Sequence, residues 1–206
     1  MKRTFYFLKN AIIAHPAWFF LVAALLWGGL MFLISIIRGK FDLDGLLTEA
    51  NGMVFDLLVF GILLSIYEKL REKRDKIERL HEEIDDYREW SEDEAMYRIV
   101  GAVKRLNKLG VSKIDLTFCF LEGANLSCAN LQGANLSCAN LQGANLTAAN
   151  LQGALFDGAN LQGAYLLHAN VGKDWFEELE KRNIKGREKI KAKYLIDENG
   201  VLREKQ

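Results

Sequence analysis

Residues with ready catalytic or metal-binding chemistry are scarce in this sequence, which has three cysteines, three histidines and no net formal charge. His15, His81 and His168 have no companions at the spacings of metal sites, and neither a phosphate loop nor a nucleophile elbow is present. No basic stretch is interleaved with aromatic residues, as in many nucleic-acid-binding surfaces. The sequence therefore predicts a protein that is not an enzyme, uses no metal or other cofactor and binds no nucleic acid.

Charge is absent from the segment ANLSCANLQGANLSCANLQGANL, which runs from Ala124 to Leu146. Alanine recurs there every five residues, and leucine follows two places after each alanine. A five-residue step turns an α-helix by about 500°, which scatters the leucines around it, and a flat strand would put every second leucine on the wrong face. The pattern instead predicts a chain that bends once per repeat, with alanine and leucine inside and the next two residues at a corner, which makes a solenoid.

The same register holds without a gap from Ile114 to Lys173, over twelve successive pentads. This segment resembles the pentapeptide-repeat family, whose pattern is Ala, then Asn or Asp, then Leu, then two variable residues. The resemblance implies a right-handed, square β-helix with four pentads per coil, and hence about three coils. Leu155 and Tyr165 replace the usual asparagine and mark two irregular corners. The residues predicted to form the solenoid core are Leu116, Leu121, Leu126, Leu131, Leu136, Leu141, Leu146, Leu151, Phe156, Leu161, Leu166 and Val171.

Both ends of such a solenoid need caps, because stacked repeats bury their core only against their neighbours. Upstream, Ser91 and a glutamate three residues later form a capping-box pattern that predicts a helix over residues 91–110. Downstream, residues 174–206 predict a helix followed by a small hairpin. The β-helix is therefore expected to occupy residues 111–173, between helical caps.

The three cysteines do not form a disulfide pattern. In a four-pentad coil, Cys119 would point inward, whereas Cys128 and Cys138 would lie at outward corners on opposite sides. Their side chains should not pair, which agrees with a reducing compartment.

Two long apolar runs precede the repeats. Residues 17–37 are 21 residues without a charge, long enough at 1.5 Å per residue to cross a hydrocarbon core of about 30 Å. The second run, residues 50–67, contains one charged residue, Asp56. Residues 1–67 are therefore predicted to form a transmembrane hairpin of two helices.

The distribution of basic residues predicts the topology of this hairpin. Lysine and arginine precede the first run and follow the second, whereas the loop between them sets Arg38 and Lys40 against three acidic residues. By the positive-inside tendency, both termini are expected in the cytoplasm. The expected location is the inner (cytoplasmic) membrane of a bacterium, as a multi-pass protein.

Apolar residues at heptad spacing continue from the second run into the charged stretch over residues 68–90. They predict one long helix that leaves the bilayer and enters a coiled coil, and hence a homo-oligomer of undetermined number. The alternative is an amphipathic helix that folds back on its own chain. The seam residues are Leu63, Ile66, Leu70, Ile77, Leu80, Ile84 and Tyr87.

Asp56 shares this seam, and its position leaves two interpretations open. Burying an ionisable group near the middle of a bilayer costs free energy, so such a residue is a candidate functional site. Copies of Asp56 in an oligomer could then line a cation pore. Nearer the outer interface, the carboxylate would be hydrated or hydrogen-bonded.

The fold class predicted from the sequence is thus α plus β-solenoid. The predicted function is a membrane-anchored, non-enzymatic scaffold whose neutral, Asn- and Gln-rich solenoid wall binds an unknown protein partner. An oligomeric pore with Asp56 on its axis is the alternative. Some pentapeptide-repeat proteins mimic DNA and protect gyrase, but that activity needs an acidic surface. Because this repeat carries only Asp115, Glu122 and Asp157, mimicry is not expected.

Overall fold

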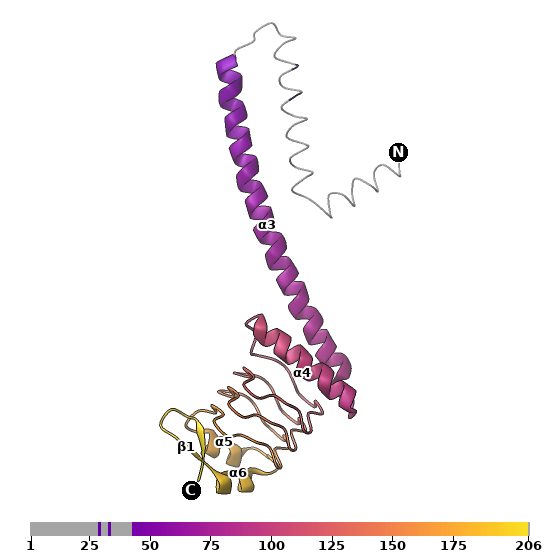
Figure 1. Cartoon of the computed structure of the whole chain (residues 1–206), viewed down its shortest axis with the longest axis vertical. Helices are drawn as coiled ribbons and strands as arrows, with labels where there is room; N and C mark the ends of the chain where they lie inside the picture. The colour runs from indigo at the N-terminus through magenta and orange to yellow at the C-terminus, as the bar shows by residue number, and fades with distance from the viewer. Residues whose placement is uncertain (1–28, 30–32, 34–42, 206) are drawn as a thin grey trace. The chain divides into compact units, whose positions relative to one another are not determined.

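The computed structural model describes residues 29, 33 and 43–205 of the chain (Figure 1). The chain divides into two compact units, Met1–Lys73 and Arg74–Gln206, which are described separately below. Apart from two residues, the first predicted span lies outside the described residues. Within the part of the chain that the structure describes, no helix is long and apolar enough to cross a membrane.

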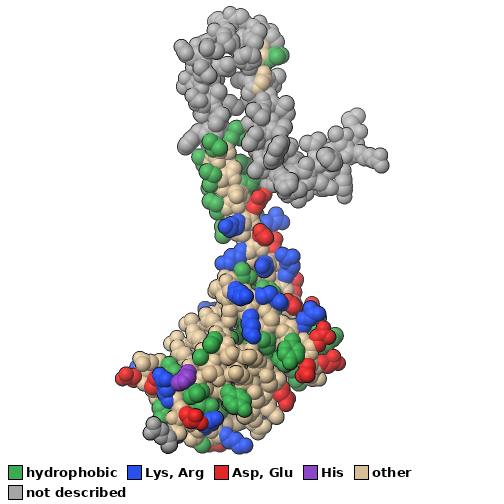
Figure 2. Space-filling view, in the orientation of Figure 1, with side chains coloured by type: hydrophobic (Ala, Val, Ile, Leu, Met, Phe, Trp, Pro, Cys, Tyr) green, Lys and Arg blue, Asp and Glu red, His purple; other side chains and the backbone are tan. Residues whose placement is uncertain are grey.

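The first described element is a single helix of 45 residues, α3 (Leu43–Tyr87). It is continuous between the second apolar run and the charged stretch that follows. In the first unit, the seam residues Leu63, Ile66 and Leu70 are exposed, at 59%, 51% and 63%. Along α3, hydrophobic side chains give way to lysine, arginine, aspartate and glutamate (Figure 2).

The seam residues in the second unit pack against other parts of their own chain. Leu80 and Ile84 are 6% and 1% exposed and belong to the same hydrophobic core as the next helix and the solenoid, and Ile77 and Tyr87 pack against it. This part of the helix therefore follows the alternative interpretation, in which an amphipathic helix covers its own chain. The coiled-coil oligomer stays a prediction for Leu63 and the other exposed seam residues.

Helix α4 (Asp93–Lys108) covers the start of the repeats with a buried face that includes Ile99, Val103 and Leu106. The predicted capping box is wrong: the N-cap residue is Glu92 and no side chain caps the first turn. Acidic residues in the first turn and basic residues in the last suit the helix dipole instead. The helix ends in a Schellman motif, since Val111 N–H donates to Leu106 O and Gly110, with a φ of 84°, to Asn107 O.

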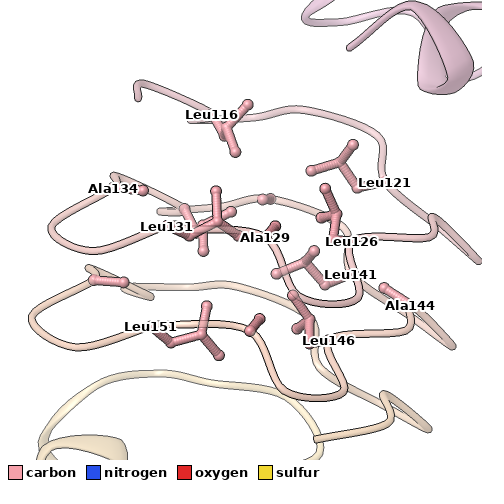
Figure 3. Close-up of a cluster of buried hydrophobic side chains, with 14 of the residues drawn as sticks. Leu116, Leu121, Leu126, Ala129, Leu131, Ala134, Leu141, Ala144, Leu146 and Leu151 are labelled. Carbon is pink, nitrogen blue, oxygen red and sulfur yellow. The ribbon is translucent and has the colours of Figure 1, made fainter. Parts of the chain in front are cut away.

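The repeats form a solenoid whose coils pair at intervals of 20 residues. Isolated parallel bridges join Asp115 to Asn135 and Asn135 to Leu155, and the same step recurs on the other sides. Four pentads therefore make one coil, as the resemblance implied. Figure 3 shows the leucines of successive coils stacked inside. We number the sides in chain order by their central residues: side 1 has Leu116, Leu136 and Phe156; side 2 has Leu121, Leu141 and Leu161; side 3 has Leu126, Leu146 and Leu166; side 4 has Leu131, Leu151 and Val171.

All twelve predicted core residues are buried, with exposed fractions of at most 4%. In the first two coils, the N–H of each central residue donates to a carbonyl of the coil below, as from Leu121 to Asn140 at 2.7 Å. The corners from Cys119 to Ala169 are closed by turns in which the N–H of the first residue of a pentad donates to the preceding central carbonyl, as from Ala124 to Leu121 at 3.1 Å. Both the apolar interior and the backbone of a coil thus depend on its neighbours.

The second residue after each central residue stands at the corner in a left-handed conformation, with a positive φ at every corner from Phe118 to His168. Glycine adopts this conformation without strain, whereas other residues lose roughly 1–2 kcal/mol. The corners that follow sides 2 and 4 carry glycine through Gly163, in a Glu-Gly pair at Gly123 and in Gln-Gly pairs after it. The corner residues without this freedom are Phe118, Cys128, Cys138, Ala148 and His168.

The chain closes the last coil with its own C-terminal segment. Lys185 pairs in parallel with Asn160 on side 2, and Val201 pairs antiparallel with Asn170 on side 4. Trp175 packs edge-on against Phe156 at 6.0 Å between ring centroids. The elements of this cap are α5 (Trp175–Lys181), α6 (Arg187–Lys193), β1 (Tyr194–Ile196) and β2 (Leu202–Glu204), the two strands forming an antiparallel hairpin.

At the other end of the solenoid, one amide side chain of α4 substitutes for a further strand. Asn107 Oδ1 accepts from Asn130 N–H at 2.8 Å, and Asn107 Nδ2 donates to Asn130 O at 2.7 Å and to Val111 O at 2.9 Å. The upper backbone edge of side 4 is therefore paired by a side chain in the way that a neighbouring coil would pair it.

Replacing Asn107 by alanine should destabilise the solenoid, because the N–H and C=O of Asn130 would lose their partners. We expect the free energy of unfolding to fall by about 1–3 kcal/mol, measured by urea denaturation of the purified chain. Lys104→Ala, an exposed change on the same helix, should stay within about 0.5 kcal/mol. Equal effects of the two substitutions would contradict the capping role of Asn107.

Candidate interaction surface

The outer wall of the solenoid is held in place by its own asparagines. In seven pentads the asparagine Oδ1 accepts the backbone N–H two residues later, as Asn125 does from Ser127 at 3.2 Å and Asn145 from Thr147 at 3.0 Å. Asp115 plays the same part for Thr117. This local bond explains why the repeat uses Asn or Asp before its central residue, a cause that the spacing alone did not reveal.

Amide side chains also join neighbouring coils along sides 2 and 4. Asn160 Nδ2 donates to Asn140 Oδ1 at 3.0 Å, and Asn150 Nδ2 donates to Asn130 Oδ1 at 3.4 Å. At the first coil, Asn140 Nδ2 donates to the Glu122 carboxylate at 3.2 Å. The wall is thus a nearly neutral and rigid surface, and few charges are visible on it (Figure 2).

The C-terminal cap accounts for one of the two predicted irregular corners. Tyr165, in the place of an asparagine, lies below the Lys193 ammonium, which is 5.9 Å from the ring centroid. In the next pentad position, Leu166 N–H donates to the buried Tyr194 hydroxyl at 3.4 Å. The other predicted position, Leu155, is 41% exposed.

A third position departs from the pattern in a way that the sequence reasoning missed. Phe120 also replaces asparagine, and it is 37% exposed beside the corner residue Phe118, which is 54% exposed. Counting the asparagine column across all twelve pentads would have found it. The repeat therefore carries exposed aromatic residues at both its first and its last coil.

Arg88, at the end of the helical segment, fixes side 1 of the first coil. Its Nη1 donates to Thr117 O at 2.7 Å and lies 3.3 Å from the Asp115 carboxylate, and its Nη2 pairs with Asp85. Burial alone would raise the pKa of Asp115, but hydrogen bonds from Thr117 and Arg88 lower it overall. Burial alone would lower the pKa of Arg88, but Asp85 and Asp115 raise it overall. Both groups are therefore held in their charged forms.

No group of three or more His, Cys, Asp or Glu side chains that could hold a metal ion occurs among residues 29, 33 and 43–205. A shallow groove of about 390 Å³ lies between the end of α3 and α4, lined by Tyr97 and by charged residues. Four of its charges form two pairs, Arg105 with Glu83 at 2.6 Å and Arg98 with Glu94 at 3.3 Å. The side chain of Asp56, the predicted intramembrane site, lies outside the described residues.

Comparison with known families decides the identity of the repeat. The family model for pentapeptide repeats matches residues 112–138 and 139–172, in eight copies. Residues 112–172 are pentapeptide repeats. Among solved structures, the chain is similar to HetL, a pentapeptide repeat protein involved in heterocyst differentiation regulation from the cyanobacterium Nostoc, with 35% identity and a TM-score of 0.23. The match covers 30% of this chain and 38% of HetL, so the chain spans well under half of that protein. The comparison with curated proteins finds no match.

The three cysteines of the pentapeptide repeats should differ sharply in reactivity. Burial raises the pKa of the Cys119 thiol to about 12, and its side chain is fully buried, whereas Cys128 and Cys138 are exposed free thiols. We expect maleimide at neutral pH to label two thiols of the native chain and a third only after denaturation, as counted by intact-mass spectrometry. Native labelling of all three at similar rates would contradict the inward position of Cys119.

Proposed function

We propose that this chain is a membrane-anchored, non-enzymatic scaffold whose pentapeptide-repeat solenoid binds a protein partner. The observation that carries the proposal is the structure of the outer wall, where side chains are pinned both to their own backbone and to the next coil. Gln142 illustrates this, because its N–H donates to Asn140 Oδ1 and its side-chain oxygen accepts from Asn160.

Such a wall suits protein recognition for two reasons. A surface whose side chains are already ordered loses little conformational entropy on binding. Its amide groups offer donors and acceptors without the desolvation penalty of a full charge. The exposed glutamines Gln132, Gln142 and Gln152 present these groups on sides 2 and 4.

Membrane anchoring is proposed from the uncharged run over residues 17–37 and from the exposure of the apolar part of α3. At 100° per residue, the exposed apolar side chains span roughly 200° of that helix. A coiled-coil seam is narrower than this, so the breadth favours lipid as the surrounding medium. We propose the bacterial inner membrane, with both termini in the cytoplasm. The exposed apolar residues are Leu58, Val59, Phe60, Ile62, Leu63 and Ile66.

Anchoring is tested by alkaline carbonate extraction of bacterial membranes. We expect the chain to stay in the membrane pellet, and Leu25→Arg with Leu26→Arg to release a large fraction of it, because each arginine costs about 2.5–3.5 kcal/mol within a span. The matched control is Gln142→Arg with Gln162→Arg, which adds the same charge to the exposed solenoid wall. Release of the unaltered chain into the soluble fraction would contradict an integral anchor.

The scaffold role is tested by photo-cross-linking from the solenoid wall. A photoreactive residue at Gln142 or Gln152 should capture the same heterologous protein in cells, because both positions are exposed on the wall. The matched control is Lys193, which faces Tyr165 and Tyr194 of the C-terminal cap. Capture of only further copies of this chain would reduce the proposed scaffold to a self-assembly.

A further inference from the structure

The upper backbone edge of the first coil is unevenly covered. Side 4 is paired by Asn107, and on side 1 Arg88 binds only the Thr117 carbonyl. On side 2, the N–H and C=O of Phe120 have no hydrogen-bond partner among the described residues, and the same holds for Asp115 on side 1 and Asn125 on side 3. In the coils below, the equivalent groups pair with the coil above, as Asn140 N–H does with Cys119 O at 2.9 Å. Side 2 of the first coil is thus an open strand edge.

The chain itself shows how such an edge is closed. At the opposite end of side 2, Lys185 N–H donates to Ala159 O at 3.0 Å, and Lys185 O accepts from Leu161 N–H at 3.0 Å. One extended residue, presenting one N–H and one C=O, is enough to satisfy one side of a coil. At the first coil, no described residue of this chain supplies that partner to Phe120.

Two aromatic residues lie beside this edge, and one of them, Phe120, departs from the repeat at a cost to the fold. Phe118 occupies a corner with a φ of 59°, where glycine would be unstrained. Phe120 stands where asparagine would accept the N–H two residues on, and Glu122 N–H has no partner in the described part of the chain. Among the described residues, neither ring pairs with another aromatic ring, and both are exposed. Residues that break a local rule without a compensating contact point to function.

The aromatic residue at the last coil makes the contrast clear. Tyr165 also replaces an asparagine, but Lys193 of the C-terminal cap covers its ring. The aromatic ring that replaces asparagine at the last coil therefore makes a contact within its own chain. Phe120, which replaces asparagine at the first coil, is exposed beside an unpaired edge and the exposed carboxylate of Glu122.

We propose that Phe118, Phe120 and Glu122 form a docking corner for an extended peptide segment of the partner protein, one that carries a lysine or arginine next to apolar side chains. The segment adds a strand to side 2 by pairing its backbone with the N–H and C=O of Phe120. Its apolar side chain covers the two phenylalanine rings, and its cation pairs with Glu122, which is the only charge on side 2 of the three coils. This inference rests on the proposed scaffold function and places its specific contact at the first coil.

The direct test measures binding of a panel of blocked, fluorescein-labelled hexapeptides, in which lysine alternates with Ile, Val or Phe, to the full chain in detergent. We expect at least one member to bind, and its affinity to fall at least fivefold in Phe120→Asn and in Glu122→Gln. Because Phe120→Asn restores the repeat pattern, its melting temperature should not fall. Tyr165→Asn, the same exchange at the last coil, should leave the affinity unchanged.

Two peptide controls separate strand addition from attraction of charge. N-methylation of alternate backbone nitrogens should abolish binding, because it removes the N–H that pairs with Phe120 O. Glutamate in place of lysine should also abolish binding. Failure of every peptide to bind, or equal binding by Phe120→Asn and the unaltered chain, would overturn the docking corner.

Repeating the cross-linking from Gln142 in cells with the variants Phe120→Asn and Tyr165→Asn distinguishes failure of the docking corner from failure of the scaffold proposal. Loss of the captured protein in Phe120→Asn, but not in Tyr165→Asn, supports both. Undiminished capture in Phe120→Asn overturns the docking corner and leaves the scaffold standing. Capture of no heterologous protein by the unaltered chain overturns the scaffold, and the corner with it.

Discussion

Every coil of this solenoid depends on the coil next to it. A single coil of four pentads cannot bury its own leucines, and most of its backbone hydrogen bonds go to a neighbouring coil, as that from Leu121 N–H to Asn140 O does. Stacking removes the leucines from water and pairs the backbone in one step. A coil with neighbours on both sides meets both requirements. At the two ends of the solenoid, other parts of the chain must bury the leucines and pair the backbone.

The two ends are closed by different means. At the last coil, extended residues such as Lys185 and Val201 continue the ladder, and a small helical cap covers the apolar interior. At the first coil, α4 covers the interior, while two side chains, Asn107 and Arg88, bind the backbone edge. Side chains close an edge at single points, which is why the first coil keeps an open stretch at Phe120.

This difference gives the molecule two kinds of outer surface. The middle of the wall is uniform, because each asparagine binds its own backbone and, on sides 2 and 4, also a neighbouring coil, as at Asn140. A uniform wall is rigid, but it has few features by which it could distinguish one binding partner from another. The corner at Phe118 and Phe120 is distinctive in shape and chemistry, and it is positioned by the same rigid coils. On a repeat of this kind, a partner is best recognised at positions whose residues differ from the repeat pattern.

The sequence by itself determined the solenoid, since a five-residue period without gaps leaves one way to bury all twelve central residues, and each is buried as predicted. It also determined that α4 ends before Gly110, because a Schellman motif needs a residue with positive φ. Only the tertiary structure decided how the long helix is used, because a heptad seam fits a second copy and its own chain equally well, and Leu80 and Ile84 are buried by their own chain. It likewise decided which edges are closed, because the pairing of Asn107 with Asn130 joins residues that no periodicity relates.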